Sequence, residues 1–382
     1  MTPRQAIGVV GGGQLAWMLA EAAQPLGIAL HVQTPSATDP ACALAASVVQ
    51  ADLRHLPATR ALAERSEVIT FENEWVDLEA LAPLAEEGVL FIPSLEALAP
   101  LVCKRHQRQL LQRLALPTPA WCDLPEDGVL PKGMAFPLMA KAAVGGYDGK
   151  GTALLQQQAD LDALLERVVP SDWILEAFVA FELELSQLAC RDSQGQVQCY
   201  PLVQTHQHHQ VCDWVLAPAA VPHAVQAFAR NIAASLLTAL QYEGVLSIEL
   251  FYGPAGLQVN EIAPRTHNSG HVTIEGSFTS QFEQQLRIAA GLPMGPVGLQ
   301  VPGALMVNLL GFEYSPSDYG PQRAELAALP GANLHWYGKH GSSPGRKLGH
   351  ITLLLDGETQ QQRQQQAMER LQQVRHIWPL PG

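Results

Sequence analysis

The segment GVLSIELFYGPAGLQVNEIA, residues 244–263, decides the fold, because its pattern predicts a β-hairpin with one acid on each strand. Glu249 and Glu261 lie at equal distances from Ala255 in the turn GPAG. If the loop contains an odd number of residues, the two glutamates face each other with Cβ atoms about 4.5–5.5 Å apart. Such close carboxylates need a compensating cation or a shared proton, and hard oxygen ligands favour Mg²⁺. An exposed, solvated pair is the alternative, which the apolar neighbours oppose.

The next segment, PRTHNSGH at residues 264–271, gathers polar groups in a chain that otherwise carries few. Only 15% of the residues are charged, against about 25% in an average globular protein. Arg265 can hold an anion through two parallel hydrogen bonds, while His267 and Asn268 can orient a small oxyanion. We therefore expect this segment to form the floor of a reaction site. The alternative for Arg265 is a structural ion pair with a nearby acid.

A glycine-rich loop, GGYDGKG at residues 145–151, lies between two predicted strands, PLMAKAA and TALLQ. It is no Walker loop, because that loop lies between a strand and a helix. Its four glycines make it flexible, and Lys141 and Lys150 bring positive charge to it. Such a loop can fold over a triphosphate and exclude water, whereas an ordinary flexible hairpin is the alternative.

The first hundred residues alternate predicted strands and helices, which indicates a parallel sheet with crossover helices. The glycine turn GGGQL, residues 11–15, lies between the first strand and a helix, where backbone N–H groups can bind a phosphate. The second strand meets no acid before Asp39, so a nicotinamide dinucleotide is disfavoured, and a plain tight turn remains the alternative to a phosphate site. The predicted strands are AIGVV (6–10), IALHVQT (28–34), EVITFE (67–72) and GVLFIP (88–93).

The rest of the chain predicts an α+β arrangement. A basic amphipathic helix at residues 101–116 precedes the glycine-loop strands. Antiparallel strands are expected in FELELSQLAC (181–190) and QVQCYPLVQ (196–204), followed by a helix at 224–240 that leads to the hairpin. Beyond about residue 297 the chain is rich in predicted strands and ends in a glutamine-rich helix.

Composition and charge exclude several partners. The formal net charge of −13 opposes binding to nucleic-acid backbones and anionic membranes, although a few focused cations can still bind a phosphorylated small molecule. The six cysteines form no Cys-x-x-Cys pair and suit reduced thiols in the cytosol. We recognise neither a signal peptide nor an apolar run long enough to span a bilayer, so we expect a cytoplasmic protein.

The glycine loop, the glutamate pair with NEIAPR, and HNSGH together resemble the ATP-grasp superfamily. Within it they look like the family of N5-carboxyaminoimidazole ribonucleotide synthases, with similarity from GGGQL through FENEWV to GKHGSSPGRKLGHI near the end. The resemblance implies an N-terminal parallel-sheet domain like the pre-ATP-grasp domain of biotin carboxylase, on the ribonucleotide side. The implied domains are 1–100, an ATP-grasp domain at 101–296 with a glycine-loop lid at about 117–181, and a small strand-rich domain at 297–382.

The resemblance also implies a reaction. ATP phosphorylates bicarbonate, and the resulting carboxyphosphate, or CO₂ released from it, carboxylates the amine of 5-aminoimidazole ribonucleotide to give ADP and phosphate. ATP and Mg²⁺ are the implied cofactors, and the implied assembly is a homodimer. The alternatives are a sister ATP-grasp ligase, such as formate-dependent glycinamide ribonucleotide transformylase, or a non-catalytic nucleotide-binding protein of the same fold.

The resemblance assigns site residues position by position. For ATP it implies Lys104, Lys141, Gly146, Tyr147, Asp148, Gly149, Lys150, Gly151, Thr152, Glu176, Ala177, Phe178, Val179, Glu184, Gln207, Asn260 and Glu261. For the ribonucleotide and bicarbonate it implies Gln14, Leu15, Glu72, Tyr147, Asp148, Lys339, Arg346 and Lys347. The implied catalytic residues are Arg265, His267, Asn268, Asp148, Lys150 and Lys339, and the implied metal ligands are Glu249 and Glu261.

The sequence departs from the family pattern at a few positions. Ala16 and Trp17 stand where the family usually has Gly-Arg, and Lys104 replaces an arginine, which keeps the charge but loses the bidentate fork. Gln207 stands where a histidine is expected. The surrounding histidines suggest either a metal site or, as we expect, a solvated loop; they are His206, His208 and His209.

Overall fold

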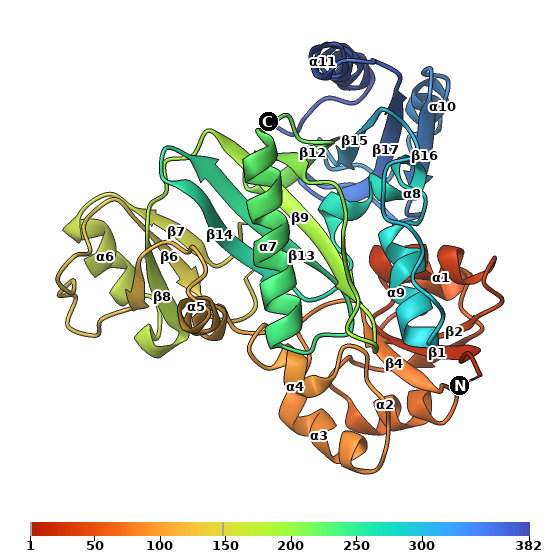
Figure 1. The fold of residues 1–382 in the computed structure, drawn as a ribbon, viewed down its shortest axis with the longest axis horizontal. Coiled ribbons are helices and arrows are strands. Elements are labelled where there is room, and N and C mark those ends of the chain that lie inside the picture. The colour runs from red at the N-terminus through yellow and green to blue at the C-terminus, as the bar shows by residue number, and fades with distance from the viewer. Residues whose placement is uncertain (1, 147–148) are drawn as a thin grey trace.

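The computed structural model describes residues 2–146 and 149–382, so Tyr147 and Asp148, predicted to contact both nucleotides, lie outside the described residues. The described chain forms a parallel sheet at the N-terminus, a small antiparallel sheet, and a large sheet that continues into the C-terminal part. Figure 1 shows these parts as lobes around a common centre. The parallel N-terminal sheet followed by strand-rich antiparallel parts confirms the predicted fold class.

The N-terminal sheet is parallel, with the order β3-β2-β1-β4. The prediction of a strand at residues 88–93 is wrong, because only Phe91 pairs with Ile69, in an isolated bridge. Ile69 N–H donates to Leu90 C=O and Ile92 N–H donates to Ile69 C=O, both at 2.9 Å, and this single bridge does not extend into a ladder. The fourth strand is instead β3, which was not predicted. The elements are β1 (Ala6–Val10), α1 (Gln14–Ala23), β2 (Ala29–Thr34), η1 (Pro40–Ala43), β3 (Ser47–Gln50), α2 (Leu56–Ala63), β4 (Val68–Phe71), α3 (Leu78–Glu86) and α4 (Leu95–Leu98).

The second sheet, ordered β5-β8-β6-β7, is antiparallel and carries the glycine loop between β6 and β7. Helix α6 packs on it through Leu161 and Leu164, which form a small separate core with Leu138 and Leu175 of the strands. The loop therefore extends from a unit that has its own hydrophobic support. The elements are α5 (Lys104–Arg113), β5 (Trp121–Asp123), β6 (Leu138–Ala142), β7 (Thr152–Leu155), α6 (Gln158–Leu165), η2 (Pro170–Asp172) and β8 (Trp173–Ala177).

The large sheet has the order β14-β13-β9-β11-β12-β15-β17-β16, with β10 beside β9. Helix α7 covers one face of its central strands, where Leu236 and Leu237 belong to the same core as Leu246 (Figure 1). The prediction of one strand at residues 196–204 is wrong, because Pro201 cannot donate to a ladder and separates β10 from β11. The elements are β9 (Leu183–Arg191), β10 (Val197–Cys199), β11 (Val203–His208), β12 (Val211–Ala217), α7 (His223–Ala239), β13 (Gly244–Gly253), β14 (Gly256–Ala263), η3 (Asn268–Gly270), α8 (Thr273–Gly276) and α9 (Gln281–Ala290).

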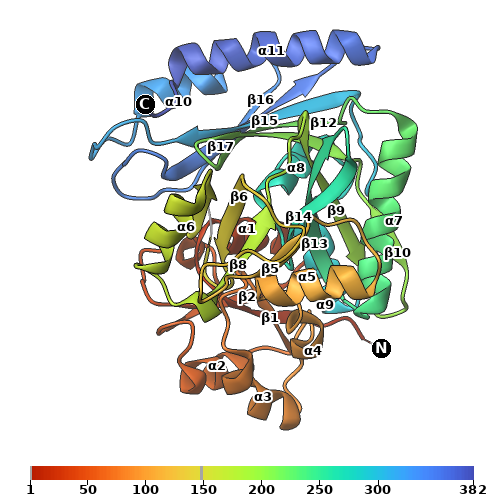
Figure 2. The same ribbon diagram turned by 90° about the vertical axis from the view of Figure 1, so that its left-hand side faces the viewer.

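The C-terminal strands extend this same sheet, because β15 pairs with β12. Figure 2 shows the long helix α11 lying across them. Trp378 and Tyr319 fill the space beneath, with ring centroids 4.9 Å apart. Helix α10 was not predicted. The elements are β15 (Gly303–Leu310), α10 (Gly320–Ala327), β16 (Ala332–Trp336), β17 (Lys347–Leu355) and α11 (Gln360–Ile377).

The hairpin of β13 and β14 places Glu249 opposite Glu261, as predicted, but for a different reason. The turn between the paired Gly253 and Gly256 holds two residues, so the condition of an odd loop is not met. In that register Glu249 would face Asn260, and Glu261 would point to the other face of the sheet. A β-bulge beside Glu249 shifts the pairing by one residue and brings the two acids together.

Two further expectations concern the whole chain. Among the described residues, no helix has both the length and the hydropathy that crossing a membrane requires. All six cysteines are free thiols in the structure.

Candidate active site

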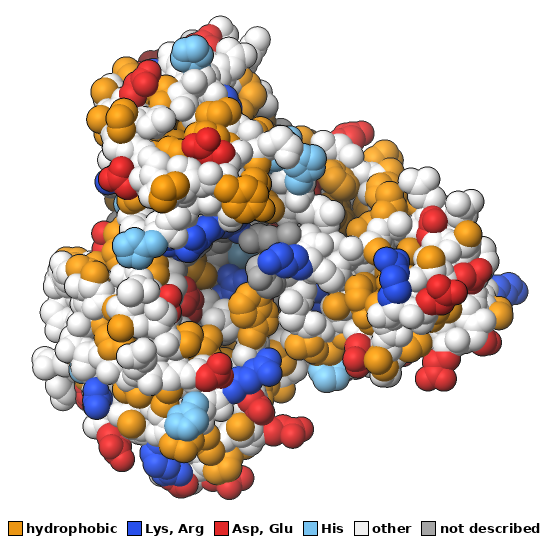
Figure 3. Space-filling view, turned by 180° about the vertical axis from the view of Figure 1, so that it is seen from behind, with side chains coloured by type: hydrophobic (Ala, Val, Ile, Leu, Met, Phe, Trp, Pro, Cys, Tyr) orange, Lys and Arg blue, Asp and Glu red, His pale blue; other side chains and the backbone are white. Residues whose placement is uncertain are grey.

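One face of the large sheet carries the polar residues of the site, because side chains alternate along each strand. Ser186 on β9 pairs directly with Glu249 on β13, so both side chains lie on this face. Their neighbours on the other face, such as Ile248 and Leu250, are buried in the core that α7 covers. The hydrophobic core on one face thus makes the strands rigid, and these strands carry the acids and hydroxyl groups on the opposite face. Figure 3 shows Lys and Arg side chains gathered around a hollow between the lobes.

A compensated charge cluster joins the second sheet to β14. Glu176 on β8 accepts from Arg108 Nε at 2.6 Å and lies 2.8 Å from Lys141 Nζ. Burial alone would raise the pKa of Glu176, but Lys141 and Arg108 outweigh it and lower that pKa to about 2. Arg108 also donates to the carbonyl groups of Val259 and Asn260, at 2.9 and 2.5 Å. The cluster therefore fixes the position of Lys141 relative to the hairpin.

The glutamate pair is far less well compensated. Glu249 accepts one hydrogen bond from Asn260 Nδ2, at 3.1 Å, and its other oxygen lies 3.5 Å from His267 Nε2. Burial raises the pKa of Glu249 to about 7, and the nearby Glu261 and Glu184 add to the effect. Glu261 pairs with Lys104 at the start of α5. Two facing carboxylates, one of which resists ionisation, therefore form a site that a cation would stabilise.

This donor set fits Mg²⁺. No cluster of three or more His, Cys, Asp or Glu side chains suited to a metal occurs in the described part of the chain. Mg²⁺ is usually held by one or two carboxylates, with phosphate oxygens and water completing its six ligands. Glu249 and Glu261 supply that number, and Lys141 lies beside them because its Nζ donates to Asn260 Oδ1 at 2.9 Å.

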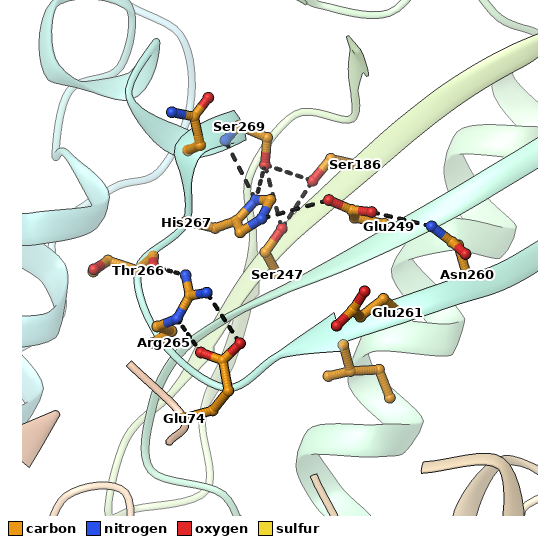
Figure 4. A network of polar contacts seen from close by, with 12 residues as sticks. Glu74, Ser186, Ser247, Glu249, Asn260, Glu261, Arg265, Thr266, His267 and Ser269 are labelled. Atoms are coloured by element: carbon orange, nitrogen blue, oxygen red, sulfur yellow. Dashed lines mark hydrogen bonds and ion pairs between the residues drawn. The ribbon is translucent and has the colours of Figure 1, made fainter. Parts of the chain in front are cut away.

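Arg265 in the predicted reaction floor is already held by an acid. Its guanidinium donates twice to Glu74, at 2.5 and 3.2 Å, and once to the carbonyl of Thr266, at 3.1 Å (Figure 4). Burial alone would raise the pKa of Glu74, but Arg265 lowers it. The structural ion pair named as the alternative is therefore present. These three bonds use three of the five N–H groups of the guanidinium, which leaves two for an anion.

The other floor residues divide between the site and the core. His267 faces Glu249, and burial lowers its pKa to about 3, helped by Arg265 and Lys347. Asn268 exchanges two hydrogen bonds with Asn308 on β15, at 2.7 and 3.2 Å, so its amide is largely engaged in the fold. His271 is fully buried.

The predicted ribonucleotide residues come from opposite ends of the chain. Lys339 Nζ donates to Gln14 Oε1 at 2.5 Å and to the carbonyl of Lys347 at 2.9 Å, which brings three of them together. Arg346 donates to the carbonyl groups of His340 and Gly341, at 2.6 and 2.8 Å. The segment of residues 339–347, which carries these basic side chains, is therefore tied to the start of α1.

The glycine turn before α1 does not hold a free phosphate site. Glu72 accepts from the backbone N–H groups of Gly13, Leu15 and Ala16, at 2.7, 3.1 and 3.4 Å. The carboxylate occupies the positive end of the helix where an anion was expected. A side chain at Gly11 would also place its Cβ 2.5 Å from a Glu72 oxygen, which explains this glycine. The prediction of a phosphate on these N–H groups is therefore wrong.

The remaining residues predicted to bind ATP come from β8, β9, β11 and the glycine loop. Glu184 on β9 lies beside Gln207 of β11, and burial raises its pKa to about 7. Ala177 ends β8, Phe178 is 46% exposed and Val179 is half-buried. In the glycine loop, the carbonyl oxygen of Lys150 lies close to Gly146, and the Lys150 side chain is exposed. Thr152 Oγ1 donates to the carbonyl of Gly149 at 2.8 Å. The described loop residues are Gly146, Gly149, Lys150, Gly151 and Thr152.

The residues that depart from the family pattern, and the histidines near Gln207, pack against other parts of the protein. Trp17 packs edge-on against His335 and Tyr337, with centroids 6.5 and 6.0 Å apart, and Ala16 is fully buried. His206 stacks on Trp214 at 5.2 Å, and His208 Nε2 donates to the carbonyl of Pro381 at 2.9 Å. These contacts favour structural histidines over a metal site.

Several residues of the site were not predicted. Glu74 and Arg108 make the ion pairs described above, and Gln281 bonds the backbone of His267. Ser186 and Ser247 lie two residues from Glu184 and Glu249, respectively, so a strand period of two would have placed each serine on the face of its neighbouring acid.

Three domain families match the chain. They are the ribonucleotide synthetase preATP-grasp domain at residues 4–101, the ATP-grasp domain at 109–282, and the C-terminal domain of phosphoribosylaminoimidazole carboxylase at 304–365. The N5-carboxyaminoimidazole ribonucleotide synthase of Synechococcus elongatus is 52% identical over 384 residues, which cover 100% of this chain and 97% of that protein.

Solved structures agree. The N5-carboxyaminoimidazole ribonucleotide synthetase of Thermus thermophilus is 35% identical, with a TM-score of 0.86 and 98% of each chain covered. The N5-carboxyaminoimidazole synthase of Aspergillus clavatus, in complex with ADP and 5-aminoimidazole ribonucleotide, is 30% identical, with a TM-score of 0.89 and 99% of each chain covered. The chain therefore belongs to the family of N5-carboxyaminoimidazole ribonucleotide synthases, which are ATP-grasp ligases.

Proposed function

We propose that this chain uses ATP and bicarbonate to carboxylate 5-aminoimidazole ribonucleotide, a step of purine biosynthesis. The observation that carries the proposal is the facing pair of Glu249 and Glu261, beside Lys141 and next to the floor of Arg265 and His267. The Aspergillus relative, solved with ADP and 5-aminoimidazole ribonucleotide, supports both ligands.

On the nucleotide side, Lys141 would contact the phosphates of ATP. Glu176 and Asn260 hold its ammonium group in place, so its charge is presented in one direction. Glu249 and Glu261 would hold Mg²⁺, which neutralises charge on the transferred phosphoryl group when it is bound. Lys104 pairs with Glu261 and supplies a second cation at this corner.

On the anion side, Arg265 would hold bicarbonate and the carboxyphosphate formed from it. Glu74 orients the guanidinium through two hydrogen bonds and leaves two N–H groups for the anion. Arg265 and Lys347 both lie close enough to His267 to lower its pKa. Lys339 and Gln14 would contact the ribonucleotide at the start of α1.

The proposed reaction consists of a phosphoryl transfer followed by a carboxylation. A bicarbonate oxygen attacks the γ-phosphorus, and the bond to the leaving ADP oxygen breaks. The amine nitrogen of the ribonucleotide then attacks the carboxyl carbon, directly or after CO₂ is released, while phosphate leaves and the amine loses a proton. The protein mainly positions these groups and stabilises their charge, as phosphoryl transfer requires.

The test is ADP release with Mg²⁺, ATP and bicarbonate, with and without 5-aminoimidazole ribonucleotide. We expect the rate to rise sharply when the ribonucleotide is added, and to depend on Mg²⁺. Hydrolysis that ignored this nucleotide but responded to glycinamide ribonucleotide and formate would instead assign the sister reaction. Absence of any nucleotide-dependent turnover would favour the non-catalytic alternative.

Three further expectations belong to this proposal. The division at residues 1–100, 101–296 and 297–382 follows the resemblance, and each of the three matched families, at residues 4–101, 109–282 and 304–365, falls largely within one of these ranges. A homodimer and a cytoplasmic location remain predictions from the sequence. Sedimentation of the purified protein tests the first of these two.

A further inference from the structure

Three buried serines lie beside His267, and one of them, Ser269, contacts its Nδ1 (Figure 4). Ser269 Oγ is 2.8 Å from His267 Nδ1 and 2.7 Å from Ser186 Oγ. Ser186 Oγ is in turn 2.8 Å from Ser247 Oγ, and Ser247 Oγ is also 3.3 Å from Ser269 Oγ. The three side chains belong to residues that are at most 2% exposed, so bulk water does not reorder their hydroxyl groups.

One backbone group indicates which ring nitrogen of His267 accepts hydrogen bonds from this cluster. The N–H of Ser269 points at His267 Nδ1, at 3.3 Å, and a backbone N–H can only donate. Nδ1 must therefore carry a lone pair, which excludes both the imidazolium and the Nδ1–H tautomer. The hydroxyl of Ser269 then also donates to Nδ1.

The remaining serines must follow the same direction. The proton of Ser269 is used on His267, so the short contact between Ser269 and Ser186 needs the proton of Ser186. The 2.8 Å contact between Ser186 and Ser247 then takes the proton of Ser247, because the other contact of Ser247, to Ser269, is longer at 3.3 Å. Donation runs from Ser247 through Ser186 and Ser269 to the imidazole, and such chains polarise one another.

We propose that the serine chain Ser247–Ser186–Ser269 sets His267 as the Nε2–H tautomer, so that the imidazole enters the site as a hydrogen-bond donor to an anion and not as a base. The Nε2–H then points toward Glu249 Oε1, 3.5 Å away, on the same side as the carboxylates. With the other tautomer, the lone pair on Nε2 would repel Glu249 whenever that carboxyl is ionised. The identity of the anion rests on the proposed function, whereas the tautomer does not.

The backbone of His267 is fixed separately from its ring. Gln281, fully buried, accepts from His267 N–H at 2.8 Å and donates to His267 C=O at 2.7 Å. A Cβ at Gly270 would lie 2.3 Å from the same amide, so the amide packs tightly against the loop. Loss of a serine hydroxyl should therefore change the proton on the ring and not the position of the chain. The serines are positioning residues that act through His267.

The consequence for the reaction concerns the proton that the amine loses. An Nε2–H imidazole cannot accept that proton at Nε2, so another group or solvent takes it. The same N–H stabilises negative charge that develops on bicarbonate or carboxyphosphate oxygens. His267→Gln, which keeps an N–H donor in the site, should therefore retain more turnover than His267→Ala.

The tautomer can be measured without substrates. Long-range ¹H–¹⁵N spectra of the ligand-free protein, labelled with ¹⁵N-histidine, distinguish protonated from bare ring nitrogens, and His267→Gln identifies the signals of His267. We expect a bare Nδ1 and a protonated Nε2. A protonated Nδ1, alone or in an imidazolium, would overturn the inference even if the protein carboxylates 5-aminoimidazole ribonucleotide. Conversely, failure of the carboxylation assay leaves the tautomer result standing.

Ser269→Ala tests whether the serines set this state. It removes the hydroxyl donor but leaves the weaker backbone donor, so we expect mixed tautomers and a turnover lowered by roughly tenfold, as for a weakened oxyanion donor, with the KM for ATP unchanged. Ser269→Thr restores a hydroxyl and should restore both readouts. The matched control is Ser277→Ala, because Ser277 is a buried serine whose Oγ makes no hydrogen bond within the described residues. If Ser269→Ala leaves tautomer and turnover unchanged, the serines do not position His267.

Ser186→Ala provides a second variant in case Ser269→Ala does not fold. It keeps the Ser269 hydroxyl on His267 but removes the donor behind it. We expect a smaller population of the second tautomer and a smaller loss of turnover, which circular dichroism and thermal melting can separate from a folding defect. An effect equal to that of Ser277→Ala would overturn the proposed chain.

Discussion

Glu176 and Glu249 are both carboxylates at the boundary between the second sheet and the hairpin, yet their charges are treated in opposite ways. Glu176 lies between Arg108 and Lys141, and its pKa falls to about 2. Glu249 faces another acid, and its pKa rises to about 7. The protein therefore compensates one carboxylate internally and leaves the other to be compensated from outside.

This difference distinguishes a structural carboxylate, Glu176, from a functional one, Glu249. A buried acid with two cations stabilises the fold only while all three partners remain. A pair of facing acids destabilises the free protein and gains stability when a cation binds.

Glu261→Gln should lower turnover by about 10³-fold or more, because it removes one of the two carboxylates proposed to hold Mg²⁺ against the phosphates. The fold should persist, since the loss of the pair with Lys104 is offset by relief of repulsion from Glu249. Ribonucleotide-dependent ADP release is the measurement, with Glu182→Gln as an exposed acidic control. Turnover near that of the unmodified protein would exclude the metal role.

Glu176→Gln should instead destabilise the protein by about 3 kcal/mol at pH 7, because Arg108 and Lys141 would be left buried without their partner. The pKa of Glu176 is lowered in the folded state, so its contribution is complete above pH 4.5 and is lost as the pH falls toward 2. Denaturant unfolding at several pH values measures this. A difference that persists unchanged at low pH would show that packing, and not charge, is responsible.

Arg265→Lys should lower turnover by about 10²-fold with little change in the KM for ATP, because lysine keeps the charge but cannot hold two oxygens in a plane. The observed ion pair with Glu74 makes a stability defect the competing outcome. Thermal melting of Arg265→Lys and Glu74→Gln, measured beside their turnover, separates the two. If Arg265→Lys melts early and its activity falls only in proportion to the unfolded fraction, Arg265 is not the bicarbonate-side cation.

Glu249→Gln should stabilise the metal-free protein at pH 8 and not at pH 4. The pKa of Glu249 is raised in the folded state, so the unmodified protein loses stability as the pH rises from 4.5 through about 7, where only the unfolded chain ionises freely. Because 29% of this side chain is exposed, we expect a gain of about 1–2 kcal/mol. Thermal melting at the two pH values measures it, and an equal gain at pH 4 would contradict the charge argument.

Gln14→Ala should have the smallest effect, a rise of a few-fold in the KM for the ribonucleotide with unchanged turnover, since it removes one acceptor of the Lys339 ammonium group, which water can replace. Steady-state kinetics at fixed ATP measure it. A large loss of turnover would show that this contact takes part in the reaction and not only in binding.

Much of the fold follows from patterns within short segments. The alternating strands and helices of the N-terminal part, the glycine loop between two strands, and the hairpin all appear where apolar periodicity and turn residues place them. The errors occur where a few residues decide the outcome, as in the broken strand at Pro201 and the missing strand at residues 88–93. Local pattern is weak there, because pairing depends on the neighbouring strand.

The sequence alone determined which groups the site contains: the glutamate pair, the arginine and histidine of the floor, and the lysines near the glycine loop. Only the tertiary structure decided how they are compensated. The bulge at Asn260 turned Glu261 toward Glu249, and Glu74, 191 residues from Arg265, took up its guanidinium. Glu72 occupied the helix end predicted for a phosphate. The reason is physical: residue type and strand period act over a few positions, whereas the pairing of charges depends on which distant segments the hydrophobic core brings together.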